Sequence, residues 1–266
     1  MKLQKISTLT GLMAAGVLAL SSAPAQAFSF TTNFTQTGGS KGDTTLNSVE
    51  KDGQIIDKFI FVNRADILEN DIAIPANPNS GGASADRGDN ATGIVVPNPS
   101  DADIVTALGN NNLNSIIDGE DGNVADSGSF KMNLFFKKAV DHLFFWERGQ
   151  NSDLNVQAID KDGNLLGSLL KILRGEWDNA GYSIDTTEIP GAQSVGSRGV
   201  SLADLGLDIK HIYGIQVSAF ADQGFNGPDF KVVGAKTVPE PASLLGLGLV
   251  AGVVGLSRRR QGTKNA

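Results

Sequence analysis

Short runs in which apolar and polar residues alternate fill the middle of this 266-residue chain. Glycine, asparagine and aspartate separate the runs, which is typical of β-strands joined by turns. No regular spacing of strands and helices accompanies them, so we predict a mainly β fold, an antiparallel β-sandwich or jelly roll. The predicted strands are residues 28–35, 58–63, 129–136, 142–147, 154–159, 165–172, 183–187, 211–219 and 230–235.

Two of these strand predictions rest on more specific sequence patterns than the others. Between 154–159 and 165–172 the sequence reads Asp-Lys-Asp-Gly-Asn, and Gly163 supplies the positive φ that a tight hairpin turn requires. The strand 142–147 carries large apolar residues at successive positions, so both of its faces are apolar. We therefore predict that this strand is central.

One or two short helices interrupt the strands. Ser100 is followed three residues later by Asp103, which resembles a capping box and predicts a helix over 101–108, with a further turn near 113–117. The same spacing from Ser201 predicts a brief helical connection there.

The chain divides into three parts. Residues 28–237 form a single predicted domain, because no internal repeat and no linker divides them. Within it, residues 75–99 are rich in Pro, Asn, Gly, Ser and Asp and predict a long exposed loop. Residues 1–27 and 238–266 have the composition of targeting segments.

The N-terminal segment has the three parts of a secretory signal peptide. Lys2 and Lys5 give a positive start, residues 9–20 are mostly apolar, and Ala25 and Ala27 form a small-x-small cleavage pattern. We predict export through the general secretion machinery and cleavage by signal peptidase after Ala27.

The C-terminal segment predicts a sorting tail. It contains, in order, Val238, Pro239, Glu240 and Pro241, then the apolar residues 242–256, then Arg258, Arg259 and Arg260. Fifteen apolar residues make a helix about 22 Å long, which is short for a permanent span of a bilayer core of about 30 Å. The arginines are costly to move through lipid and should stay on the cytoplasmic side. A plain transmembrane anchor and an apolar C-terminal helix of the fold are the alternatives, and the four glycines of the run argue against the second.

Val-Pro-Glu-Pro, a short apolar helix and an arginine cluster together resemble the PEP-CTERM sorting signal of exosortase-dependent proteins. The resemblance implies a Gram-negative bacterium, such as a cyanobacterium, and removal of the tail by a membrane-embedded exosortase. It also implies association with exopolysaccharide or biofilm. Residues 143–149 (LFFWERG) and 227–234 (GPDFKVVG) resemble exosortase-dependent surface proteins of the XDP2 type, for which no activity is implied.

The body is acidic and has no cysteine. Between Phe28 and Pro239 there are 16 Lys or Arg and 28 Asp or Glu, so the formal charge is 16 − 28 = −12. Such a charge argues against nucleic acid and anionic lipid as partners. Without cysteine there is neither thiol catalysis nor a zinc–thiolate site.

Acidic side chains predict a calcium site or a solvated loop. Asp118, Glu120, Asp121 and Asp126 place four carboxylates within nine residues. Carboxylates this close repel one another unless water or a cation such as Ca²⁺ separates them. No other cofactor is indicated.

Two glutamates next to tryptophans suggest carboxylate catalysis as an alternative. Glu147 follows Trp146, Glu176 precedes Trp177, and glycoside hydrolysis needs one carboxyl group on each side of a cleft. An ion pair at the strand end, for example with Arg148, is the structural interpretation of Glu147 and is the more usual one for a charge at this position. No other enzyme signature occurs, so we expect that the protein is not an enzyme.

The leading functional prediction is a non-catalytic protein of the cell surface or extracellular matrix, delivered after transient anchoring in the inner membrane. Binding of extracellular polysaccharide is a natural role there. Trp177, Tyr182 and Tyr213 are the candidate stacking residues, and burial in the core or at an interface is the alternative for each. A calcium-dependent structural or adhesive module is a further alternative.

Overall fold

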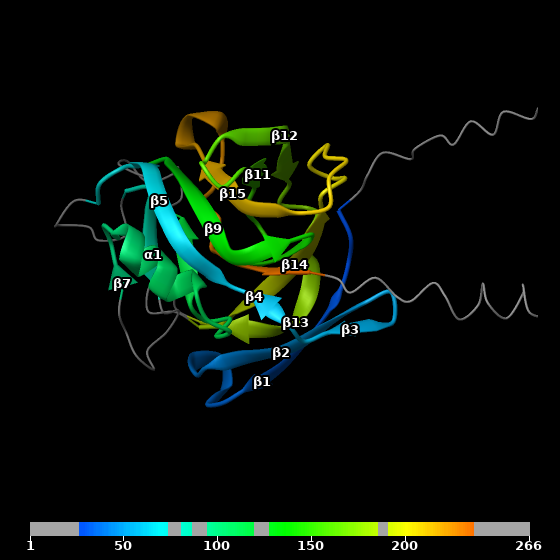
Figure 1. Cartoon of the computed structure of the whole chain (residues 1–266). Coiled ribbons are helices and arrows are strands. Elements are labelled where there is room, and N and C mark those ends of the chain that lie inside the picture. Colours follow the sequence, from blue (N-terminus) through cyan, green and yellow to red (C-terminus); the bar gives the residue numbers. More distant parts are fainter. Residues whose placement is uncertain (1–26, 74–80, 87–94, 120–127, 186–190, 237–266) are drawn as a thin grey trace, which may run out of the picture.

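The computed structural model describes residues 27–73, 81–86, 95–119, 128–185 and 191–236. It confirms the mainly β prediction: three antiparallel sheets and one α-helix form a sandwich-like body (Figure 1). The predicted signal peptide and the predicted sorting tail lie outside the described residues. Within them, no helix is both long enough and apolar enough to cross a bilayer.

The largest sheet has eight strands. Its order is β13 (Asp178–Ile184), β14 (Gln193–Ser201), β10 (His142–Arg148), β16 (Phe230–Ala235), β8 (Ile116–Gly119), β6 (Ala83–Asp86) and β7 (Val95–Val96), with β4 (Phe59–Ile60) also beside β16. A five-stranded sheet has the order β12 (Leu165–Ile172), β11 (Leu154–Ile159), β15 (Ile212–Ala219), β9 (Phe130–Val140) and β5 (Val62–Asn70). The third sheet is β1 (Thr31–Gln36), β2 (Thr44–Lys51) and β3 (Gln54–Ile56).

The eight-stranded sheet is the middle layer, with a hydrophobic core on each face (Figure 1). Side chains of β10 alternate between the two cores. Leu143 and Phe145 pack toward the five-stranded sheet, whereas Phe144 and Trp146 pack toward the three-stranded sheet. The ring of Phe30 lies 5.4 Å from that of Trp146. The prediction that this strand is central is confirmed, because β10 pairs with β14 and with β16.

The predicted helix over 101–108 is confirmed with the same bounds, as α1 (Asp101–Leu108). Ser100 caps it: the Ser100 hydroxyl accepts a bond from the Asp103 N–H, and the Asp103 carboxylate accepts one from the Ser100 N–H. Ile104 and Leu108, four residues apart, are both fully buried against the core.

The hairpin between β11 and β12 is also confirmed. The Asp160 N–H donates to the Asn164 carbonyl over 2.9 Å, and Gly163 has φ 87°. The Asp160 carboxylate accepts bonds from the N–H groups of Asp162 and Asn164, at 2.8 and 2.9 Å. These bonds fix the turn, as expected for an aspartate in such a loop.

Three local predictions need correction. The turn predicted near 113–117 covers only 113–114, and β8, whose four residues are all buried and pair with β6, begins at Ile116. The cap at Ser201 forms, but it closes a turn over 202–206 and no helix follows. The predicted loop 75–99 contains β6 and β7. Two 3₁₀ turns, Gly39–Lys41 and Ala221–Gln223, complete the described elements.

Candidate functional site

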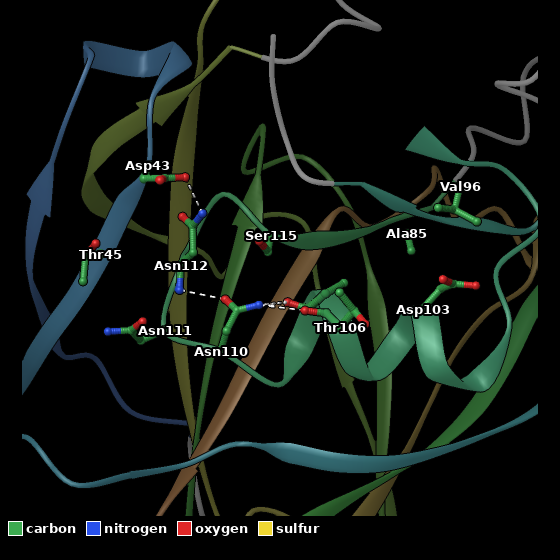
Figure 2. A pocket seen from close by; sticks show the side chains of 11 residues that line it. Asp43, Thr45, Ala85, Val96, Asp103, Thr106, Asn110, Asn111, Asn112 and Ser115 are labelled. Atoms are coloured by element: carbon green, nitrogen blue, oxygen red, sulfur yellow. Dashed lines mark hydrogen bonds between the residues drawn. The ribbon is translucent and has the colours of Figure 1, made fainter. Parts of the chain in front are cut away.

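A polar cavity of about 560 Å³ opens where the three-stranded sheet, α1 and the β6–β7 pair meet (Figure 2). We call it the asparagine cavity. It is lined by Asp43, Thr45, Ala85, Val96, Asp103, Thr106, Ala107, Asn110, Asn111, Asn112 and Ser115. Eight of the eleven lining residues have carboxamide, hydroxyl or carboxylate side chains, and the small apolar side chains come from the β6–β7 side and from α1.

One face of α1 forms a wall of the cavity. Asp103, Thr106 and Ala107 follow the helical spacing of three and four residues, which places them in one stripe. The Ser100 hydroxyl donates to the Asp103 carboxylate over 2.6 Å. This bond and that of the Ser100 N–H lower the pKa of Asp103, so the carboxylate is negative at neutral pH.

Ser100 therefore links the stability of α1 to the shape of the wall. Replacing Ser100 with alanine is expected to lower the free energy of unfolding by about 1 kcal/mol, because a helix N-cap is lost. Denaturant unfolding measures this change. The Thr106→Ala variant, which removes a hydroxyl from the same helix without touching the cap, is the control and should cost clearly less.

The loop after α1 forms the opposite side through a chain of asparagine side chains. The Asn112 side chain donates to the Asp43 carboxylate over 2.7 Å, and its Oδ1 accepts bonds from the N–H groups of Thr44 and Asn114. The Asn110 Oδ1 accepts the Asn112 N–H over 2.8 Å. Because each carboxamide both donates and accepts, the loop is held to β2 in one arrangement (Figure 2).

A fully buried lysine donates hydrogen bonds to the end of α1 and to this loop. Lys231 on β16 is 0% exposed, and its Nζ donates to the Ala107 carbonyl over 2.6 Å and to the Asn110 Oδ1 over 3.2 Å. Burial holds the pKa of Lys231 well below its ordinary value. The Ala107 carbonyl lies in the last turn of α1, where a positive charge interacts favourably with the helix dipole. Lys231 thus fixes the helix end that forms the cavity wall.

The chemistry of the asparagine cavity suits a neutral ligand rich in hydroxyl groups. Sugar hydroxyls both donate and accept hydrogen bonds, as do carboxamides and hydroxyls of the lining. The carboxylates of Asp43 and Asp103 disfavour an anion. Sequence reasoning missed this site, although the run Asn110–Asn111–Asn112 directly after a predicted helix was a visible signal.

A second polar cluster lies inside the body, at the end of β10. The Arg148 guanidinium donates to the Asp118 carboxylate over 3.0 Å and to the Asp229 carboxylate over 2.9 Å, and all three side chains are nearly inaccessible. Burial, and then the charge of Asp118, raise the pKa of Asp229 well above its usual value. Arg148, the partner expected for Glu147 at this strand end, thus pairs with Asp118 and Asp229.

Glu147, next to this cluster, is 0% exposed. Burial raises the pKa of its carboxyl group from 4.5 to about 8. The Ser152 hydroxyl and the N–H groups of Gln150 and Asn151 oppose this shift, but among the described residues none reaches either carboxylate oxygen with full hydrogen-bond geometry.

The structure does not bring Glu147 and Glu176 to a common cleft. Glu176 is exposed in the turn before β13, where its Oε2 accepts the Leu173 N–H over 2.9 Å. Glu147 is sealed in the interior. Neither lines the asparagine cavity or the second cavity described below.

The predicted stacking residues differ in their access to solvent. Trp177 and Tyr182 are 7% and 6% exposed, so neither offers a ring face to a ligand. Both are buried in the core, which was the alternative to a stacking role. The Trp177 indole N–H donates to the Ser152 carbonyl over 2.8 Å. Tyr213 is 44% exposed, and its ring meets that of His211 edge-on at 5.5 Å.

Of the predicted calcium ligands, the structure describes only Asp118. Its carboxylate is turned inward to Arg148. Glu120, Asp121 and Asp126 lie outside the described residues. Within the described part of the chain, no group of three or more acidic, histidine or cysteine side chains has the arrangement of a metal site.

Comparison with known proteins identifies the tail. Residues 237–261 match the family model described as the PEP-CTERM protein-sorting motif. The resemblance seen in the sequence is thereby confirmed: the chain carries a PEP-CTERM sorting motif, which implies recognition by exosortase, export, and anchoring in the membrane through the C-terminus before sorting. No curated protein and no solved structure matches the chain. The resemblance of the body to XDP2-type surface proteins and a cyanobacterial origin stay predictions.

Proposed function

We propose that the body is a non-catalytic component of the cell surface or extracellular matrix that binds a neutral polysaccharide in the asparagine cavity. The observation that carries this proposal is the lining itself: three consecutive asparagines, two threonines and a serine around a volume of about 560 Å³. That volume is within the range of sites for small ligands, such as a few sugar units.

Two further observations support the proposal. The sorting motif implies export of the chain, and the outside of a bacterial cell is where polysaccharide is abundant. The cavity wall is also preorganised, because Lys231, Ser100 and Asn112 hold its side chains before a ligand arrives. Preorganisation reduces the entropy lost on binding.

A non-catalytic role is supported by the placement of the carboxyl groups. Hydrolysis of a glycosidic bond needs an acid and a second carboxylate about 5–10 Å apart across the substrate. Glu147 is buried away from solvent and Glu176 is exposed in a turn. If the wild-type protein released reducing ends from matrix polysaccharide and the Glu147→Gln variant did not, the non-catalytic assignment would be wrong.

Filling the cavity should abolish binding. In the Thr106→Trp variant an indole occupies the space beside α1, so retention on immobilised neutral exopolysaccharide is expected to be lost. Ala102→Trp is the matched control, because Ala102 is exposed on the same helix but outside the stripe that lines the cavity. Affinity chromatography of the exported protein measures both.

A smaller change tests the hydrogen-bonding chemistry. Asn111→Ala removes an exposed carboxamide and is expected to weaken binding roughly 3–10-fold, the effect of one hydrogen bond. Equal retention of wild type, Thr106→Trp and Asn111→Ala, with unchanged unfolding transitions, would contradict the proposed site.

A further inference from the structure

A second cavity, of about 870 Å³, combines lysines with an apolar floor. We call it the lysine cavity. It is lined by Lys58, Phe59, Ile60, Phe61, Val62, Asn63, Val105, Gly109, Lys137, Lys138, Ala139 and Lys236. All four lysines are exposed, and no acidic side chain is among these residues. On a body of formal charge −12, this is a local reversal of sign.

Strand pairing brings the lysines together from distant parts of the sequence. Ala235 at the end of β16 pairs with Phe59 of β4. Lys236 follows Ala235 and Lys58 precedes Phe59, so the antiparallel pairing brings these two lysines to the same place. The Lys137 N–H donates to the Phe61 carbonyl over 3.2 Å, which places the end of β9 beside the same segment. The nearest acidic residues in sequence are Asp57 and Asp141, and neither lines the cavity.

The position of the lysine cavity relative to the tail is fixed by chain length. Lys236 is immediately followed by the matched sorting motif, and the apolar run begins at Ala242. Six residue steps span at most about 20 Å. While the tail is in the bilayer, the lysine cavity is therefore tethered within about 20 Å of the membrane surface.

We propose that the lysine cavity is a docking surface for anionic lipid headgroups, which orients the body on the membrane while the tail is still inserted. Lysines near an anionic surface are attracted to it, and partly buried phenylalanines suit the boundary between headgroups and acyl chains. The remaining acidic surface of the body is repelled, so this face is the one that turns to the bilayer. The overall charge alone had argued against anionic lipid as a partner.

The test uses the full chain, embedded through its tail in phosphatidylcholine vesicles with or without phosphatidylglycerol. The chain has no cysteine, so Asn63→Cys introduces a single thiol for an environment-sensitive dye inside the lysine cavity. Ala203→Cys is the control position, in the exposed turn that bonds to β12 at the far edge of the five-stranded sheet. Quenching by a headgroup-linked quencher reports the docked fraction.

We expect strong quenching at position 63 only in vesicles with phosphatidylglycerol, and little at position 203. Lys137→Glu combined with Lys138→Glu should lower the ratio of docked to undocked protein by at least roughly 30-fold, which is the effect of losing two lysine charges before the repulsion by the new carboxylates is added. The matched pair Lys161→Glu and Lys210→Glu makes the same charge change elsewhere and should leave the ratio unchanged. Quenching that is independent of phosphatidylglycerol, or insensitive to the Lys137 and Lys138 changes, would overturn the proposal.

An acidic polysaccharide is the competing occupant. If the Lys137 and Lys138 changes abolished binding of the tail-free product to an acidic exopolysaccharide while quenching showed no lipid dependence, the membrane assignment would be overturned. Retention on neutral polysaccharide through the asparagine cavity is a separate measurement, so the two proposals fail independently.

Discussion

Replacing Glu147 with glutamine is expected to stabilise the protein at alkaline pH and to change little at acidic pH. Glu147 is 0% exposed, and burial raises its pKa from 4.5 to about 8. Above pH 8 the wild type must hold an ionised carboxylate in the interior, whereas glutamine stays neutral. Between pH 5 and pH 8.5, the stability of the variant relative to wild type should grow by about 3–4 kcal/mol.

The sign follows from proton binding. A carboxyl group whose pKa is raised by folding binds more protons in the folded than in the unfolded state between the two pKa values, so stability falls as pH rises. Glu147 therefore contributes its full stability below about pH 4.5 and loses it as pH rises through about 8. Lys231, whose pKa is lowered by burial, has the opposite dependence, but it is present in both proteins. The difference between them isolates Glu147.

Urea unfolding at several pH values between 5 and 8.5 gives the required free energies. The Glu50→Gln variant, which removes an exposed carboxylate from β2, controls for the loss of one negative charge. A difference between wild type and Glu147→Gln that does not vary with pH would show that the carboxyl group is not held neutral by burial.

The strongest sequence signals were those in which a local pattern and the tertiary environment agree. Apolar residues on both faces of 142–147 identified a central strand, and β10 has a core on each side. The capping box at Ser100 fixed the start of α1, since the bonds it predicts involve only neighbouring residues. The hairpin at Gly163 was predictable for the same reason.

Strands were missed where packing breaks the expected pattern. In β14, Gly196 and Gly199 occupy places where Trp177 and Phe28 lie against the backbone; a Cβ on Gly199 would come within 2.1 Å of the Phe28 ring. The aromatic rings that cover β14 thus belong to other segments. In β2, Leu46 and Val49 are buried three residues apart, because a register shift in its pairing with β1 interrupts the alternation.

The two cavities could not be predicted because each needs contacts between distant segments. The asparagine cavity joins β2, the β6–β7 pair and the loop after α1, and both β2 and β6 were absent from the predicted strands. The lysine cavity depends on the pairing of β16 with β4. By contrast, the sorting tail works as a linear motif, so the sequence alone was sufficient to find it.

Separate changes in the tail should produce two different failures of sorting. Replacing Pro239 and Glu240 with alanine removes the motif that exosortase recognises but leaves the apolar run and the arginines. The protein is then expected to remain in the inner membrane with its tail intact. Replacing Arg258, Arg259 and Arg260 with serine keeps the motif but removes the barrier to complete export.

The arginine variant has a physical basis that the motif variant lacks. Each arginine costs about 2.5–3.5 kcal/mol at the centre of a membrane span, so three of them oppose passage by roughly 8–10 kcal/mol. As a helix, the fifteen residues 242–256 would be about 22 Å long, which is too short to hold firmly in a core of about 30 Å once the charges are gone. We therefore expect this variant to reach the periplasm or medium with residues 242–266 still attached.

Mass spectrometry of both termini in membrane and soluble fractions distinguishes the two products, with Lys264→Ser as the control for loss of a single charge. Normal processing of the triple serine variant would show that the arginines do not hold the tail.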